Sequence, residues 1–115
     1  MHIDLMYNKE WLKGSLKIII LKLLRDKNRL HGYQIRKEID QISQGSIQLT
    51  EGALYPALHK MESDRWIRNE PEYQGKRLRK YYSLTSLGET QAQESIEAYF
   101  EFVRTMILIL TPDSN

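Results

Sequence analysis

The chain has 115 residues, of which 41% are hydrophobic and 28% charged, a composition typical of one globular domain. It contains no cysteine, which excludes disulfide bonds, thiolate metal sites and a cysteine nucleophile. The net charge is only +2, but residues 1–84 carry 16 Lys and Arg against 10 Asp and Glu while residues 85–115 carry one against five, so a basic body precedes an acidic tail.

The sequence gives no sign of export or of a membrane. Residues 1–11 lack a basic region followed by an apolar run, so no signal peptide is expected. The longest apolar runs, at 18–21 and 106–110, are far shorter than a membrane span. Together with the lack of cysteine, these features predict a cytoplasmic protein.

Three helices are predicted in the first half of the chain. Residues 9–28 and 31–43 repeat apolar side chains every three or four positions, which is the period of a helix with one buried face. A short break around Gly45 precedes the third helix, where Thr50 occupies an N-cap position. Pro56 is expected near the start of that helix, because its ring removes a backbone hydrogen bond. The buried stripe of the third helix consists of Leu54, Leu58 and Met61.

A hairpin with a basic tip is predicted next. Residues 66–73 and 78–84 are rich in β-favouring side chains, and Gly75 lies between them. Adjacent like charges repel, so crowded cations there indicate an anion that belongs to another molecule. The alternative is a solvated tip whose charges protect an edge strand. The cations are Lys76, Arg77, Arg79 and Lys80.

The chain returns to helix after Thr85, a second candidate N-cap. Apolar residues then alternate at spacings of four and three, as in a helix–helix seam. This stripe is either an intramolecular core or a dimer interface, and the dimer is favoured because so long a terminal helix projects beyond a small domain. Its members are Ala92, Ile96, Tyr99, Val103, Met106 and Leu110.

Three helices followed by a hairpin form the winged helix-turn-helix arrangement, in which the third helix enters the major groove of DNA and the basic wing lies along phosphates. The predicted fold is therefore mostly α with a small β-hairpin. Residues 1–84 form the DNA-binding domain, and residues 85–115 form a C-terminal dimerisation helix.

The motifs "HGYQI", "LTEGALYPALHKMESDRWI" and "GKRLRKYYSLTSLGE" resemble the PadR family of bacterial transcriptional regulators. The resemblance covers residues 12–90. It implies a homodimer in which the C-terminal helix packs on its partner and on the partner's first helix. With a single C-terminal helix, the chain resembles the short subfamily, without the extended effector domain of larger members.

Residue roles are assigned on this basis. Tyr33 is interpreted as a core aromatic residue with a hydrogen-bonded hydroxyl, and a DNA contact is the alternative. His59 is not expected to bind a metal, since neither His2 nor His31 pairs with it, and no metal or other cofactor is predicted. Leu12, Leu16 and Ile19 are expected to join the dimer interface. The predicted DNA-binding residues, besides the four wing cations, are Thr50, Gly52, Tyr55, Pro56, His59 and Lys60.

A ligand site is a further expectation. The resemblance to the short subfamily implies that the dimer seam can hold a flat hydrophobic effector between aromatic side chains. Plain core packing is the alternative for Phe100 and Met106. The candidate ligand residues are Trp11, Tyr99, Phe100 and Met106.

The sequence thus predicts a dimeric, DNA-binding transcriptional regulator, a repressor at a promoter operator. The alternative is a winged-helix adaptor that binds a protein partner and ignores DNA. An enzyme is not predicted, because the chain has no phosphate-binding glycine loop and no recognisable catalytic constellation.

Overall fold

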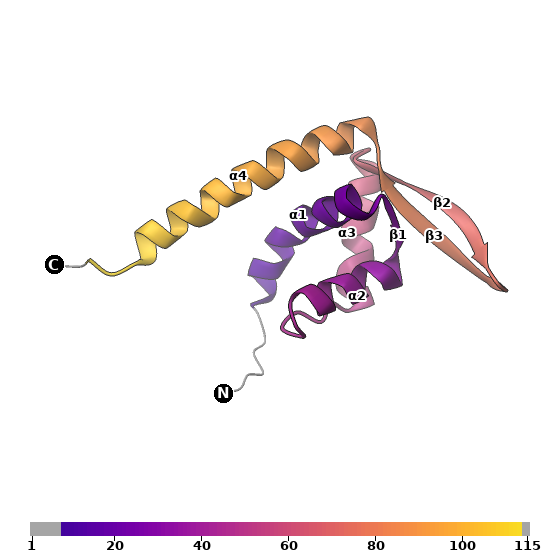
Figure 1. Ribbon diagram of the computed structural model, residues 1–115, viewed down its shortest axis with the longest axis horizontal. Helices are drawn as coiled ribbons and strands as arrows, with labels where there is room; N and C mark the ends of the chain where they lie inside the picture. The colour runs from indigo at the N-terminus through magenta and orange to yellow at the C-terminus, as the bar shows by residue number, and fades with distance from the viewer. Residues whose placement is uncertain (1–7, 114–115) are drawn as a thin grey trace.

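A computed structural model gives the fold and describes residues 8–113. Most of the segment inspected for a signal peptide, and His2 with it, lies outside this range. Figure 1 shows helices and a hairpin in the predicted order, with one additional short strand. The elements are α1 (Lys9–Lys27), β1 (Arg29–His31), α2 (Gly32–Ile42), α3 (Glu51–Ser63), β2 (Ile67–Gln74), β3 (Arg77–Leu84) and α4 (Ser86–Leu110).

Side-chain caps fix where the helices begin. Thr50 accepts a hydrogen bond from the Ala53 amide, and Thr85 accepts one from the Gly88 amide, as their N-cap positions predicted. Asn8 caps α1 in the same way. α3 runs through Pro56, its sixth residue, which lies in the second turn and so near the start of the helix as predicted.

The sheet has three antiparallel strands in the order β1-β3-β2. The predicted hairpin is present, and the prediction lacked the third strand, β1. β1 pairs with the end of β3, and Leu30 lies opposite Tyr82. Three residues are too few to show the alternation that identifies a strand, and the charged run before them suggested a turn. β2 and β3 extend beyond β1 as the wing, and Gly75 takes a positive φ of 65° in the turn between them.

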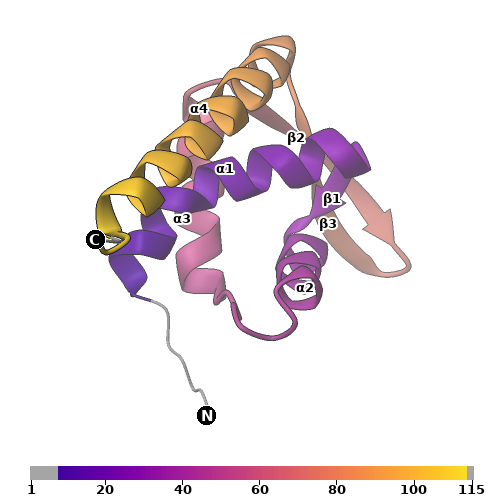
Figure 2. The same ribbon diagram turned by 60° about the vertical axis from the view of Figure 1, so that its left-hand side comes forward.

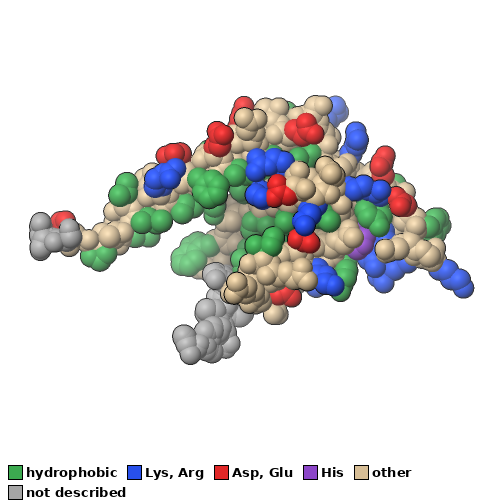
Figure 3. Space-filling model, viewed as in Figure 1, with side chains coloured by type: hydrophobic (Ala, Val, Ile, Leu, Met, Phe, Trp, Pro, Cys, Tyr) green, Lys and Arg blue, Asp and Glu red, His purple; other side chains and the backbone are tan. Residues whose placement is uncertain are grey.

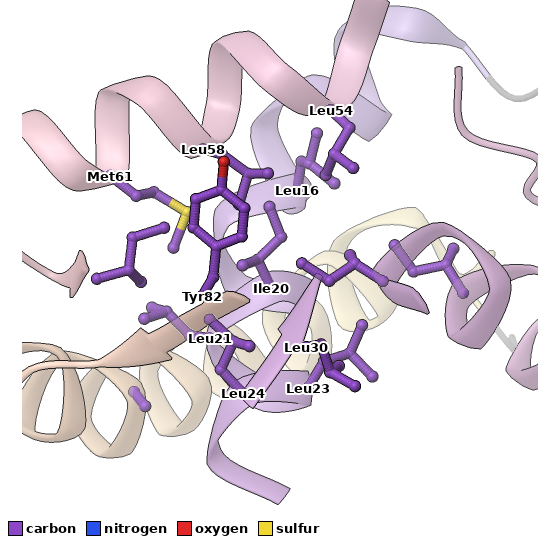
Figure 4. Packing of buried hydrophobic residues seen from close by; sticks show 14 of the residues in the cluster. Leu16, Ile20, Leu21, Leu23, Leu24, Leu30, Leu54, Leu58, Met61 and Tyr82 are labelled. Atoms are coloured by element: carbon purple, nitrogen blue, oxygen red, sulfur yellow. The ribbon is translucent and has the colours of Figure 1, made fainter. Parts of the chain in front are cut away.

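The hydrophobic core lies between α1, α3 and the sheet. Figure 4 shows the Tyr82 ring among side chains from α3 and α1. Burial raises the pKa of Tyr82 to about 12, so its hydroxyl stays neutral. The largest fully buried side chains are Tyr82, Ile20, Leu21, Leu24, Ile35, Leu54, Leu58 and Met61.

α4 divides into an inner and an outer half. Its inner half packs along α1 and buries Ala92 and Ile96. Its outer half extends away from the other elements, which makes the molecule 62 Å long but only 35 and 21 Å across (Figure 1).

Candidate nucleic-acid interface

α3 presents one buried and one exposed face. Leu54, Leu58 and Met61 lie in the core, as predicted. The opposite face carries Gly52, Ala53 and Pro56 in its first half and longer polar side chains further on. Lys60 is exposed and forms an ion pair with Asp64 at 3.2 Å. The exposed predicted residues of this helix and its cap are Thr50, Gly52, Pro56, His59 and Lys60.

Tyr55 lies between α2 and α3 rather than on the outward face. Its side chain is half-buried and packs against the core. Its hydroxyl occupies the space that a Cβ at Gly32 would need, so only glycine permits this approach. Tyr55 therefore helps set the distance between the two helices of the turn motif.

Arg36 holds the segment that leads into α3, a role that sequence reasoning did not identify. Its Nε donates a hydrogen bond of 2.9 Å to the Leu49 carbonyl oxygen, and its guanidinium lies 3.6 Å from the Glu51 carboxylate. The two contacts fix the start of α3 relative to α2. The helical position of Arg36, opposite the apolar stripe of α2, was the available signal.

The wing distributes its cations over both faces of the hairpin. Strand alternation places Arg77 and Arg79 on the face of Tyr81, and Lys80 on the opposite face with Leu78. Figure 3 shows Lys and Arg side chains at the free end of the wing. Lys76, Arg77 and Lys80 are exposed, while Arg79 is half-buried.

At the base of the wing, three aromatic rings meet. The His31 ring lies 6.3 Å from the Tyr33 ring and contacts the Tyr81 ring edge-on at 5.2 Å. Burial lowers the pKa of His31, and the positive charges of Arg79 and Arg77 lower it further. A neutral His31 ring avoids the repulsion that a protonated ring would have with Arg79 and Arg77.

The residues predicted for the dimer interface fall into two groups. Leu16, Ala92 and Ile96 are buried within this chain, where they join α1 to α4. The remaining residues keep accessible surface, and Leu110 near the end of α4 is the most exposed of those on that helix. They are Leu12, Ile19, Tyr99, Val103, Met106 and Leu110.

The predicted ligand residues are only partly brought together. The hydroxyl groups of Tyr99 and Ser15 share a hydrogen bond of 2.5 Å, and Ser15 also donates to the Trp11 carbonyl oxygen. The Trp11 side chain is 73% exposed. Phe100 instead lines a shallow hollow with acidic residues of α4, among them Glu97. Ser15 of α1 therefore links Tyr99 of α4 to the Trp11 backbone, and Phe100 is directed elsewhere.

The described residues also bear on membrane and metal binding. Within residues 8–113, none of the helices combines the length and the apolar composition needed to cross a bilayer. The same residues hold no cluster of three His, Asp or Glu side chains suited to a metal ion.

Residues 20–94 match the sequence profile of the family described as "Transcriptional regulator PadR-like family". This range begins inside α1, includes α3 and the whole wing, and ends in the inner half of α4. The chain belongs to the PadR-like family of transcriptional regulators. Its fold is the mostly helical winged-helix fold of that family, as the sequence predicted.

Several relatives support the assignment of this PadR-like protein. The "Transcriptional regulator Rv3488" of Mycobacterium tuberculosis is 27% identical over 86% of this chain and 89% of its own length. The structure of a transcriptional regulator from Clostridium thermocellum aligns with a TM-score of 0.79 at 25% identity, covering 90% of this chain and 99% of the other. Bacillus subtilis PadR in complex with operator DNA aligns with a TM-score of 0.63 at 29% identity, covering 70% and 46%. The PadR-like protein is thus a regulator rather than an enzyme.

Proposed function

We propose that the protein is a homodimeric repressor that binds a promoter operator in the cytoplasm. α3 enters the major groove, and the wing cations contact phosphates beside it. In support, the structural relative Bacillus subtilis PadR is described in complex with operator DNA. Residues 1–84 bind DNA, and residues 85–115 hold the two copies together.

One observation carries this proposal. The start of α3, α2 and the free end of the wing all lie on one side of the molecule, while α4 lies on the other (Figures 1 and 2). The first half of the exposed face of α3 has small side chains at Gly52 and Ala53 that would permit close approach to DNA. The wing supplies cations that would interact with the DNA phosphates. Among the exposed residues of α3, His59 has ring nitrogens that could donate to or accept from base edges.

The proposed signal is a small hydrophobic molecule bound beside Tyr99 and Trp11. Both residues lie where α4 leaves α1, next to apolar surface that a second subunit would cover. A flat molecule held there would change how α4 meets α1, and through α1 the position of α3.

The first prediction tests the wing. Replacing Lys76, Arg77 and Arg79 together with alanine should weaken binding to duplex DNA at every sequence, because phosphate contacts are lost. The log–log dependence of affinity on salt should become shallower by about one for each contact removed. Fluorescence anisotropy of a labelled mixed-sequence duplex over a salt series measures both quantities.

A matched control removes the same charge elsewhere. Lys9, Lys13 and Lys22 are exposed on α1, and their triple alanine variant should keep most of the salt dependence. An equal loss in both variants would mean that net charge, rather than the wing, is responsible. If the unaltered protein shows no salt-dependent binding to duplex DNA, the adaptor alternative is the correct one.

A further inference from the structure

Tyr33, interpreted from the sequence as a core residue, is 53% exposed at the second position of α2. Its ring lies on the same side of the sheet as the outward cations of the wing, since it faces Arg79. Within residues 8–113 its hydroxyl has no protein hydrogen-bond partner. A tyrosine hydroxyl beside a cation is well suited to contact an anion.

Arg79 lies beside this tyrosine with a buried side-chain nitrogen that lacks a hydrogen-bond partner among the described residues. Its guanidinium carbon lies 6.0 Å from the centre of the Tyr33 ring, within range of a cation–π interaction. Its Nε is buried and, among the described residues, has no hydrogen-bond partner. A buried donor without a partner is unfavourable, and a guanidinium is the group that best matches phosphate oxygens. The side chain is therefore ordered by packing without being neutralised.

The carboxylate nearest in register to Arg79 is occupied by another cation. Glu72 lies directly opposite Arg79 across the β2–β3 ladder, where oppositely charged side chains normally pair. Instead, Glu72 accepts a hydrogen bond of 2.5 Å from Arg29 on the far strand β1. Arg29 in turn lies 4.0 Å over the ring of Tyr81. The three-stranded sheet thus draws Glu72 toward Arg29 and leaves Arg79 available.

We propose that Tyr33 and Arg79 together bind one phosphate of the DNA backbone, with Arg29 acting as a positioning residue that holds Glu72 away from Arg79. The proposal rests on the proposed DNA-binding function and extends the interface from the wing to the start of α2. His31 supports the pair from below, because it is 4% exposed and stacks on Tyr33. The contact is preorganised, so little side-chain entropy is lost on binding.

The first test separates the hydroxyl from the charge. Tyr33→Phe should weaken binding of a labelled mixed-sequence duplex roughly tenfold through loss of one hydrogen bond to a charged group, without changing the salt dependence. Arg79→Ala should weaken binding and reduce the salt slope by about one. Tyr73→Phe, on the opposite face of the wing, is the control and should behave like the unaltered protein.

The second test addresses the positioning role. Arg29→Ala frees Glu72 to pair with Arg79, so the salt slope should fall as it does in Arg79→Ala. Adding Glu72→Gln should restore the slope, because the competing carboxylate is gone. Adding Glu97→Gln instead restores the same net charge on a distant face of α4 and should restore nothing. Thermal unfolding followed by circular dichroism shows that each variant is folded.

The outcomes test the Tyr33–Arg79 phosphate contact separately from the proposed DNA-binding function. No salt-dependent duplex binding by the unaltered protein overturns the DNA-binding function and the phosphate pair together. Normal binding that Tyr33→Phe leaves unchanged overturns the pair alone. Equal recovery with Glu72→Gln and Glu97→Gln overturns the role given to Arg29.

Discussion

His31 connects β1 to α2, and its imidazole accepts a hydrogen bond at Nδ1. Its Nδ1 accepts a hydrogen bond of 3.3 Å from the Gln34 amide, and the Gln34 side chain accepts from the His31 amide, which completes a capping box. A protonated Nδ1 would lose this acceptor role. Burial and the positive charges of Arg79 and Arg77 lower the pKa of His31 and so oppose protonation.

The second prediction follows from the lowered pKa. As pH falls below about 6.5, the unfolded chain binds a proton at His31 that the folded protein does not, so the free energy of unfolding decreases until the folded pKa is passed. His31→Asn keeps a capping oxygen but removes the titration. Denaturant unfolding over a pH series should therefore show a shallower acid loss in His31→Asn than in the unaltered protein.

His59 provides the comparison for this experiment. It is exposed on α3 and has no capping role, so His59→Asn should retain the acid-dependent loss of stability. Identical pH profiles for His31→Asn and the unaltered protein would show that His31 is not responsible.

Sequence reasoning recognised the residue types at this junction but not their positions. The exposure of Tyr33 depends on how α2 lies against the wing, and the strand that joins the two, β1, is too short to predict. The unpaired state of Arg79 depends on a contact between Arg29 and Glu72, which are 43 positions apart. No local pattern contains either fact.

At the scale of elements, α4 is locked onto the end of α3 and the start of β2. The Thr85 hydroxyl donates to the Arg65 carbonyl oxygen at 2.6 Å, and the Thr85 amide donates to the Trp66 carbonyl oxygen at 3.0 Å. Gly88 lies against the same Trp66 carbonyl, and a Cβ there would overlap it. The first turn of α4 thus depends on a glycine for close backbone approach.

The third prediction concerns this junction. Gly88→Ala should destabilise the protein by about 1–3 kcal/mol, because a backbone oxygen must move to admit the methyl group. The gain in helix propensity is only about 0.5–1 kcal/mol and should not offset that cost. Gly14→Ala in α1 is the matched control, since nothing lies within 4 Å of its added Cβ. Denaturant midpoints should fall for Gly88→Ala and rise for Gly14→Ala, and a rise in both would contradict the close packing described.

The elements themselves followed from local signals. Thr50 and Thr85 predicted the starts of α3 and α4, and apolar periodicity predicted the helices within one or two residues. Gly75 marked the wing turn. What the sequence did not provide was the division of the wing cations between faces relative to α2, because that requires the position of β1.

At the scale of the whole molecule, the outer half of α4 has more apolar surface than one chain covers. Residues on several of its sides are exposed, far beyond the body of the domain (Figure 3). Such a surface usually marks an interface with another protein. The exposed apolar residues there are Phe100, Phe102, Val103, Ile107, Leu108, Ile109 and Leu110.

The fourth prediction tests the proposed dimer. Val103→Asp combined with Leu110→Asp should convert dimers to monomers in sedimentation velocity, because two charges would be buried in the seam. Both side chains are exposed in the single chain, so the substitutions should leave its folding intact. Leu108→Asp is the control, because helix geometry places Leu108 on nearly the opposite side of α4 from Leu110. Dimers that survive the double substitution would locate the interface elsewhere.

The heptad stripe could not show by itself where the core ends. Ala92 and Leu110 belong to the same apolar stripe, yet Ala92 is buried against α1 and Leu110 is 76% exposed. The length and direction of α1 decide this difference, and they belong to another part of the sequence. For the same reason Ile96 is unsuitable for testing the dimer, since it lies in the core of the single subunit.

α1 lies at the centre of the molecule, with α4 packed on one side and α2 and α3 on the other (Figure 2). Close-packed interiors transmit a displacement rather than absorb it. If a ligand between α4 and α1 tilts α1, the two α3 helices of the proposed dimer change their spacing as rigid bodies. Loss of register with two successive turns of the double helix would then suffice for release, without melting any helix.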